Sequence, residues 1–458
     1  MSQSQALQRG IRATLWRGGT SKGLIFLASR LAPFTQETRD AIICAAMGSP
    51  DPDGRQIDGL GGGASSLSKV AIINAPGRGG VSVARSAGNR FPGVPWSEDN
   101  TPTSAAHPVT GWDLVYRFGQ VPINGTKIDW GSTCGNLVAA VAQQSINTRT
   151  VDTTVVNERA MAAGVDPQDP QARFMCPVRI LQAESGNRVL ASVAVSRHPD
   201  NNKWWFADAV GEATIAGVPG KHASTVIETQ LQGTLLPTSR AKDTVMLGTE
   251  AVEISVVDAG LPVIFVRASD MSVDFDQLTS HPASLDADLG LMQRIEALRK
   301  AASSLDSSLS GLYFPGSAAP KVCLLHPRAT YRTTGSTEVR GEEVDCLARA
   351  VSVGQFHRTI PATTLSALGA ASALGDTVVS DVVKEGGASI NTPPPPWALA
   401  TAPTAGQQIV SFSVGQPAGV SSTCLRMSAD ASPVPEAILM ERTARQLMDG
   451  DVPIPESI

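Results

Sequence analysis

The chain of 458 residues lacks both the cysteine pairs of disulfide-rich proteins and the histidine spacings of metal sites. Its six cysteines show no CxxC motif, and several lie in apolar segments, as is typical of buried, reduced thiols. The six histidines show neither an i, i+4 pair nor an HExxH motif. We therefore expect neither a disulfide framework nor a metal site.

Basic charge and long apolar runs are also scarce. Lysine and arginine number 37 against 42 acidic residues, so the net charge of −5 supplies no basic stripe for a nucleic acid. No apolar run approaches the roughly 20 residues of a membrane span. The start MSQSQALQRG lacks the profile of a signal peptide. We expect a cytoplasmic protein that binds neither nucleic acid nor membrane.

The sequence does contain many β-rich, turn-bounded segments and a few helical ones. A single core stops growing near roughly 250 to 300 residues, so this length predicts two large domains. Strands and helices together predict an α+β fold with two similar halves, in which strands precede a helix of small residues. The predicted strands are 12–16, 23–28, 68–75, 81–86, 113–121, 176–181, 188–195, 252–260, 262–268, 320–326 and 407–414. The predicted helices are 34–48, 134–145, 292–305, 344–353 and 363–375.

Two stretches are too rich in proline, glycine and small polar residues for regular elements. Residues 88–108 and 388–406 are predicted to be exposed loops or insertions. The polar segment SRHPDNNKWW places a domain boundary near residue 200.

The first candidate site motif is RGGTSKG, from Arg17 to Gly23, between two predicted strands. Its glycines expose backbone N–H groups beside Thr20 and Ser21, and such a nest suits a carboxylate. An ordinary glycine-rich hairpin is the alternative. The motif does not match the phosphate-binding GxxxxGK[ST] pattern.

The second motif is DGLGGGASSLSKVAII, in which Ser65 and Ser66 precede Lys69 at the start of an apolar strand. Burial beside apolar residues would lower the pKa of a lysine and make it a general base near neutral pH. A solvated lysine at a strand start is the alternative, because lysine is rarely buried.

The third motif is DWGSTCGNLVAAVAQQS, in which Cys134 stands beside Gly135 and Asn136 where an apolar helix begins. The unpaired N–H groups of a helix N-terminus stabilise a thiolate and also hold a carboxylate. An inert core cysteine is the alternative.

In the second half, Lys321, His357 and Arg358 are the candidate positive charges for an acidic substrate. A loop or capping histidine and a surface ion pair are the alternatives for His357 and Arg358.

These motifs resemble, nearly end to end, the PrpF family, the methylaconitate cis-trans isomerase-like proteins of the diaminopimelate epimerase and proline racemase fold. The motifs that carry the resemblance occur in the family's order. They are RGGTSKG, DGLGGGASSLSKVAII, FGQV, CGNL, GVPG, LLPT, VDAG, PKV, SVGQFHR and RTARQLMDG.

The resemblance implies two epimerase-like domains, residues 1–200 completed by 430–458 and residues 201–429. Each would be a curved, barrel-like β structure around a central helix, with the active site in the cleft between the domains. The residues that match Lys69 and Cys134 flank the substrate as acid and base in family members. Known relatives act on 2-methylaconitate, aconitate, methylitaconate or 4-oxalomesaconate.

The sequence departs from the family pattern at Leu261, where asparagine is common, at Gln416, where histidine is common, and at Ala418, where serine is usual. A second catalytic cysteine, as in the amino-acid epimerases of this fold, has no match near residues 359–363. Racemisation of amino acids is therefore disfavoured.

We expect a cofactor-independent isomerase that transfers an allylic proton on a small unsaturated di- or tricarboxylic acid such as methylaconitate or aconitate. A 4-oxalomesaconate tautomerase, a secondary-metabolism isomerase for a less charged acid and a non-catalytic partner of an aconitase-like enzyme are the alternatives. The substrate, the direction of proton transfer and a homodimer are left open. Beside Lys69 and Cys134 as catalytic residues, the expected substrate-binding residues are Arg17, Gly19, Thr20, Ser21, Ser65, Ser66, Gly135, Asn136, Lys321, His357 and Arg358.

Overall fold

The computed structural model describes most of the chain as two compact units. The first unit comprises Met1–Thr214, Pro219–Ile227 and Arg442–Ile458, and the second comprises Ile215–Val218 and Glu228–Glu441. The described residues are 8–74, 112–131, 133–183, 188–198, 203–231, 233–315, 317–388, 393–399, 407–430 and 433–458. The predicted strand 81–86, the loop 88–108, most of the loop 388–406 and the boundary segment at 199–202 lie outside them.

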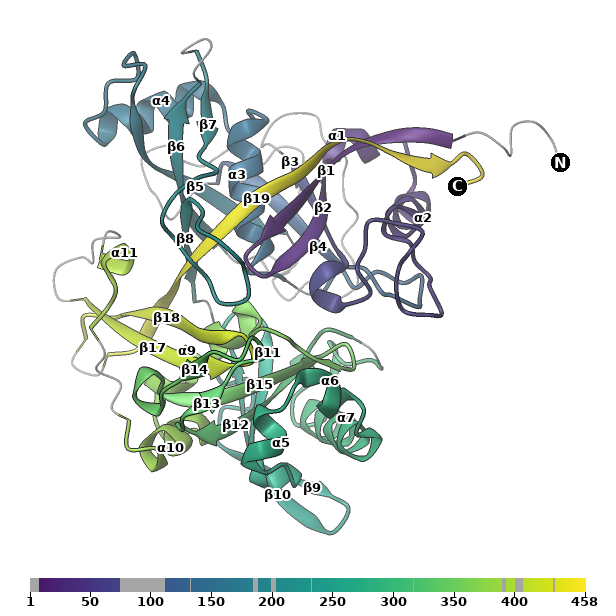
Figure 1. The fold of residues 1–458 in the computed structure, drawn as a ribbon, viewed down its shortest axis with the longest axis vertical. Helices are drawn as coiled ribbons and strands as arrows, with labels where there is room; N and C mark the ends of the chain where they lie inside the picture. Colours follow the sequence, from purple (N-terminus) through teal and green to yellow (C-terminus); the bar gives the residue numbers. More distant parts are fainter. Residues whose placement is uncertain are drawn as a thin grey trace. The chain divides into compact units, whose positions relative to one another are not determined.

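The strands of the first unit close on themselves. Hydrogen-bonded neighbours run β19–β1–β2–β3–β4–β5–β6–β8 and return to β19, so the sheet forms a barrel (Figure 1). The strands are β1 (Gln8–Gly18), β2 (Ser21–Leu27), β3 (Lys69–Asn74), β4 (Leu114–Gln120), β5 (Arg173–Gln182), β6 (Arg188–Arg197), β7 (Trp205–Ala207), β8 (Ser224–Gln230) and β19 (Pro435–Pro455). The chain passes from one unit to the other within β8 and within β19.

Helix α3 (Leu137–Asn147) is the core of this barrel. Every residue from Leu137 to Ile146 is buried, and alanine and valine side chains let the strands approach it closely. Its buried glutamines are satisfied, since Trp16 Nε1 donates to Gln144 Oε1 at 3.0 Å and Gln143 Nε2 donates to Thr225 Oγ1 at 3.0 Å. The helix therefore has a fixed rotation within the barrel.

The opposite side chains of the same strands form a second apolar layer. Val70 and Ile72 of β3, with Phe26 of β2, pack with α1 (Ala28–Leu31) and α2 (Gln36–Met47). The remaining helical segments of this unit are α4 (Thr153–Ala162) and η2 (Ser65–Leu67).

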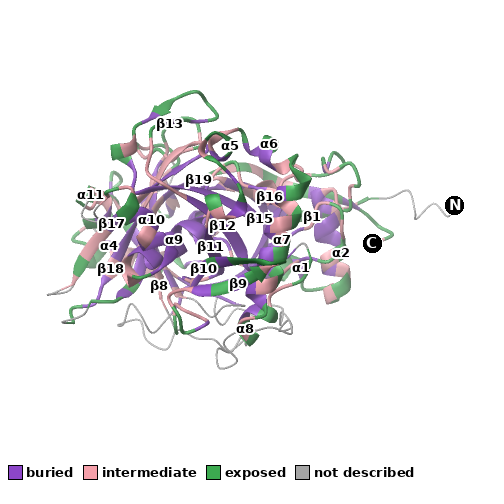
Figure 2. Ribbon diagram, turned by 90° about the horizontal axis from the view of Figure 1, so that it is seen from below, coloured by how far each residue is buried: buried purple, intermediate pink, exposed green. Residues whose placement is uncertain are grey.

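The second unit also bends a sheet around a buried helix. Its pairing order is β9–β10–β11–β12–β15–β17–β18–β19, and α9 (Ala362–Leu374) packs on one face, where Figure 2 draws it almost wholly as buried. The larger strands are β9 (Asp243–Leu247), β10 (Glu250–Asp258), β11 (Pro262–Arg267), β12 (Lys321–Pro327), β15 (Cys346–Ser352), β17 (Gln408–Gln416) and β18 (Gly419–Met427). The short strands are β13 (Tyr331–Arg332), β14 (Glu338–Val339) and β16 (Gln355–Phe356).

Further helices complete the second unit, and α7 contributes most to the apolar layer on the other sheet face. They are η3 (Ser269–Met271), α5 (Phe275–Thr279), α6 (Pro282–Asp286), α7 (Leu289–Ser303), α8 (Ser307–Ser310), η4 (Gly341–Glu343), α10 (Val378–Glu385) and α11 (Pro396–Leu399). Both units thus combine curved sheets with helices, which confirms the α+β class.

One predicted helix is wrong. Within the predicted helix 344–353 the chain forms strand β15 (Cys346–Ser352), which pairs with β12 on one side and with β17 on the other. A central strand buried on both faces reads as a continuous apolar run, which periodicity does not distinguish from a buried helix. Its arginine, Arg349, stays buried because its guanidinium donates to the carbonyl oxygens of Leu278, Ala348 and Gly415.

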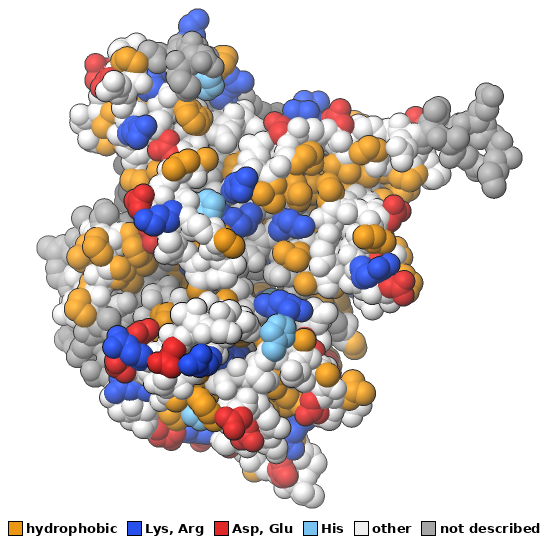
Figure 3. All heavy atoms as spheres, viewed as in Figure 1, with side chains coloured by type: hydrophobic (Ala, Val, Ile, Leu, Met, Phe, Trp, Pro, Cys, Tyr) orange, Lys and Arg blue, Asp and Glu red, His pale blue; other side chains and the backbone are white. Residues whose placement is uncertain are grey.

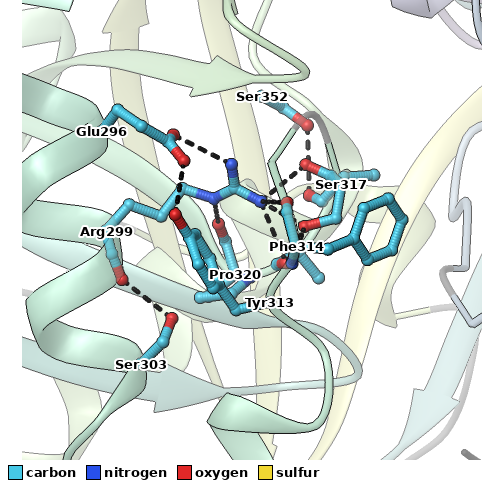
Figure 4. Close-up of polar contacts among 10 residues, drawn as sticks. Glu296, Arg299, Ser303, Tyr313, Phe314, Ser317, Pro320 and Ser352 are labelled. Atoms are coloured by element: carbon cyan, nitrogen blue, oxygen red, sulfur yellow. Dashed lines mark hydrogen bonds and ion pairs between the residues drawn. The ribbon is translucent and has the colours of Figure 1, made fainter. Parts of the chain in front are cut away.

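A buried arginine also anchors the segment before β12. Arg299 of α7 donates through Nε to the carbonyl of Pro320 at 2.9 Å and through Nη2 to that of Ser317 at 2.8 Å (Figure 4). Glu296 balances its charge at 3.0 Å. These bonds fix the strand that begins at Lys321.

Charged side chains of both signs are interspersed over the face drawn in Figure 3. Among the described residues, no helix combines the length and apolarity needed to cross a bilayer.

The contact between β1 and α3 gives a stability prediction. A Cβ at Gly18 would lie 2.7 Å from the carbonyl oxygen of Asn136 and 2.9 Å from Leu137 Cα. We expect Gly18→Ala to destabilise the protein by about 1–3 kcal/mol, because strand and helix must move apart. Thermal unfolding measures the effect. Gly125→Ala is the matched control, because its Cβ would meet nothing nearer than 3.5 Å. Equal midpoints for the two variants would contradict the prediction.

Candidate active site

Strand alternation places Lys69 on the inner face of the barrel. Lys69 begins β3, and Ala71 and Ile73, which point to the same face, belong to the core around α3. The Lys69 residue is only 8% exposed. The structure therefore contradicts the solvated-lysine alternative.

Gln120, opposite Lys69 in the β3–β4 register, holds its amine. Lys69 Nζ donates to Gln120 Oε1 at 2.6 Å. The Gln120 Nε2 donates to the carbonyl oxygens of Ser65 at 3.0 Å and Ser68 at 2.8 Å. The ring of Phe118 lies 5.1 Å from Nζ, a distance at which it attracts a cation.

Burial lowers the pKa of Lys69 from the usual 10.5, because the ammonium form loses its hydration. Negative charges on Cys134 and Asp129 oppose the shift by favouring the ammonium, but burial has the larger effect. The lowered pKa makes a neutral amine available closer to neutral pH.

Cys134 lies just before α3, near the same inner face. The backbone N–H of Leu137 donates to Cys134 Sγ at 3.4 Å, and Ser21 Oγ lies 3.9 Å from the sulfur. The cysteine is 7% exposed. Cys134 therefore lies at the N-terminal end of α3, where backbone N–H groups are free of intrahelical partners.

The β1–β2 hairpin is fastened to the start of α3 by Asn136. Its Nδ2 donates to Thr20 Oγ1 at 3.1 Å, and its Oδ1 accepts from Arg442 Nε at 3.0 Å. Gly19, at φ +53°, leaves room for this amide, since a Cβ there would lie 2.4 Å from Asn136 Oδ1. The hairpin thereby brings Ser21 to the cysteine.

Arg17 braces the same hairpin. Its Nη1 donates to the carbonyl oxygens of Gly19 at 3.1 Å and Thr443 at 2.9 Å. Burial, and secondly the charge of Arg445, lower the pKa of Arg17. The buried Nη2 has no hydrogen-bond partner among the described residues, and the same holds for Thr133 Oγ1, next to Cys134.

The other first-unit candidates lie in these same segments. Ser65 and Ser66 belong to η2, just before β3, and Ser65 supplies the carbonyl that accepts from Gln120. Gly135 separates Cys134 from Asn136. All first-unit candidates therefore lie in three segments: the β1–β2 hairpin, η2 with the start of β3, and the start of α3.

The three second-unit candidates have separate surroundings. Lys321 is buried, and its Nζ donates to the carbonyl of Ala318 at 3.1 Å. Arg358 is exposed, with Nη1 3.4 Å from Nε2 of His281. The backbone N–H of His357 donates to the carbonyl of Ala350 at 2.8 Å. Their roles in binding stay predictions.

The departure at Gln416 has a structural explanation. The side chain is fully buried, and Oε1 accepts from the backbone N–H groups of Ile360 at 3.3 Å and Ala418 at 3.1 Å. Gln416 therefore ties two loops together. Leu261 is buried at 1% exposure.

Sequence reasoning missed three residues of the site: Gln120, Thr133 and Arg442. The FGQV segment contained Gln120, but only the register of β3 against β4 shows that it faces Lys69. Arg442 is 306 positions from its partner Asn136, so no local pattern connects them.

Comparisons with known proteins agree on one family. The family model described as PrpF protein matches residues 8–87 and 104–413. A 2-methyl-aconitate isomerase of Shewanella oneidensis is 28% identical, with 97% of each chain covered. A (4E)-oxalomesaconate Delta-isomerase of Novosphingobium sp. is 30% identical, with 96% of each chain covered. The crystal structure of a methylitaconate-delta-isomerase has the same fold, with a TM-score of 0.62 at 24% identity, covering 98% of this chain and 97% of that one.

The lowered pKa of Lys69 predicts a pH-dependent stability. Between that lowered value and 10.5 the amine is neutral in the folded protein and protonated in the unfolded chain. The unfolded chain then binds more protons, so the Lys69 contribution to the free energy of unfolding increases with pH by about 1.4 kcal/mol per pH unit. We expect Lys69→Met to be more stable than the parent, with a difference that shrinks as the pH approaches 10.5.

Urea unfolding of both proteins from pH 7 to 10 measures this difference. Lys127→Met, at an exposed lysine of the same unit, is the control and should parallel the parent. A Lys69→Met curve that also parallels the parent would show that Lys69 has an ordinary pKa.

Proposed function

The chain belongs to the PrpF family, and we propose that it is an isomerase that moves an allylic proton on a small unsaturated polycarboxylic acid. Lys69 and Cys134 are its acid–base pair, with protein side chains as the only proton donors and acceptors. The observation that carries the proposal is the buried amine of Lys69, held at 2.6 Å by a neutral amide and within electrostatic reach of the Cys134 sulfur.

The lowered pKa supports Lys69 as the base. In the starting state the Lys69 amine is neutral and Cys134 is a thiol. The amine removes a proton from the carbon γ to a carboxylate, across a C=C bond, and becomes an ammonium. The C–H electron pair passes through the C=C bond to the carboxylate, giving a dienolate in which the original double bond has single-bond character.

The Cys134 thiol then returns a proton to the dienolate. Protonation at a different carbon gives a shifted double bond, and rotation before protonation at the original carbon gives the cis-trans isomer. The enzyme is left with an ammonium and a thiolate, and transfer of one proton from Lys69 to Cys134 restores the starting state. The N–H groups at the start of α3 stabilise the dienolate charge.

Local donors support an acidic substrate despite the net charge of −5. Arg17 Nη2 and Thr133 Oγ1 are buried polar atoms without a protein partner among the described residues, and a substrate carboxylate would satisfy them. Methylaconitate, methylitaconate and oxalomesaconate, named for the relatives, are all unsaturated acids with several carboxylates. We propose an acid of the methylaconitate or aconitate type.

Removal of either catalytic group gives the third prediction. Lys69→Ala and Cys134→Ser should each reduce isomerisation and the incorporation of solvent deuterium by about 10²- to 10⁴-fold, because each removes one proton-transfer group. Proton NMR in D₂O measures both rates with methylaconitate, aconitate and 4-oxalomesaconate as probes.

Lys127→Ala and Cys44→Ser are the matched controls, one exposed lysine and one buried cysteine elsewhere in the first unit. Both should retain exchange. Undiminished exchange in Lys69→Ala and Cys134→Ser together would refute the acid–base assignment. A parent protein that is thermally stabilised by an acid but exchanges no proton would instead be a binding protein.

A further inference from the structure

The amide of Gln120 has only one workable orientation. Gln120 is 5% exposed, and its Nε2 donates to the carbonyl oxygens of Ser65 and Ser68. Rotating the amide by half a turn would set its oxygen against both carbonyls and its NH₂ group against the Lys69 amine. The two contacts with the carbonyl oxygens would then be repulsive and both of their hydrogen bonds would be lost, so Oε1 is fixed toward Lys69.

We propose that Gln120 is a positioning residue for Lys69, which fixes the direction of the amine with a neutral acceptor and so leaves it able to lose its proton. This inference rests on the proposed function, in which Lys69 is the base. Gln120 itself transfers no proton, and it acts on the substrate only through its hydrogen bond with Lys69.

The neutrality of the acceptor is the central physical feature. An amine donates one N–H to Oε1 both as NH₂ and as NH₃⁺, so the nitrogen keeps its position when the proton is transferred. A carboxylate at the same 2.6 Å would attract the ammonium strongly in this buried site and hold the proton on Lys69. An amide therefore gives direction without fixing the charge.

The other groups that act electrostatically on Lys69 belong to different segments. The Cys134 sulfur precedes α3, and the carboxylate of Asp129 follows β4, where the backbone of residue 129 pairs with that of Gln120. Both groups remain when only the side chain of residue 120 is changed. Because Gln120→Glu and Gln120→Met both lose the bonds that Nε2 donates to Ser65 and Ser68, the comparison of these two variants isolates the effect of the charged acceptor.

Gln120→Glu tests the role of charge. It keeps the shape of the side chain and an oxygen for Lys69, adds a negative charge, and loses the two hydrogen bonds that Nε2 donates to the carbonyls of Ser65 and Ser68. We expect the acid limb of the kcat/KM profile to move up by about one pH unit or more, so that activity on that limb is about tenfold lower and recovers at high pH. KM should change less than twofold.

Gln120→Met tests the role of direction. An apolar side chain of similar length removes the acceptor, so kcat should fall at least tenfold at every pH without an upward shift of the acid limb. Gln143→Met is the matched control, because Gln143 is a buried glutamine of the same unit that bonds to Thr225. The control should keep the pH profile of the parent.

A direct titration separates this inference from the proposed function. The ¹⁵Nζ chemical shifts of the nine lysines, with Lys69 assigned through Lys69→Arg, report the charge of Lys69 without any substrate. We expect the Lys69 midpoint at least one pH unit higher in Gln120→Glu than in the parent, and lower in Gln120→Met.

An unchanged Lys69 midpoint in folded Gln120→Glu would overturn the inference, and so would a Gln143→Met shift of equal size. Should Gln120→Glu fail to fold, a Gln120→Met midpoint equal to that of the parent would overturn it. The Lys69 midpoints of the Gln120 variants could shift as expected while the parent protein exchanges no proton with any probe. That result would support the positioning role of Gln120 and refute the proposed function.

Discussion

The burial of helix α3 inside a closed ring of strands is the constraint on which the site depends. A barrel holds a helix only if the side chains between them are small, and α3 meets this demand with alanine and valine. Gly18 completes it, because a Cβ there would lie against the helix backbone. The N-terminus of α3 then meets the β1–β2 hairpin, and Cys134 is held beside Ser21 as a consequence of packing.

Burial inside this barrel makes Lys69 reactive and also reduces the stability of the protein. An amine 8% exposed in an apolar barrel loses hydration, so its charged form is disfavoured. A protein selected only for stability would place an apolar residue at this position. Gln120 and the ring of Phe118 instead give the amine neutral partners. The protein is therefore less stable than it would be with an apolar residue at position 69, but it keeps an amine that can change its charge.

The sequence was sufficient for the strand-rich α+β class and for the two segments that carry Lys69 and Cys134, because these depend on local pattern and on motif order. It was insufficient for β15, whose burial on both faces removed the alternation that identifies a strand. It was also insufficient for Gln120 and Arg442, whose partners are 51 and 306 positions away. Such pairs are set by strand register and barrel closure, which no local window contains.

Gln416 stands where histidine is common in the family, and it shows that such a departure is weak evidence for the loss of a polar contact to the substrate. Its amide oxygen accepts two backbone N–H groups in a fully buried position, so the side chain is required by the local fold. Histidine in its place would offer the backbone one acceptor nitrogen of different reach, and the loops at Ile360 and Ala418 would have to adjust to it. A departure of this kind changes how a loop is held before it changes what the loop binds. Substrate preference in this chain is therefore better sought in the atoms of Arg17 and Thr133 that have no partner among the described residues than in the departures from the family pattern.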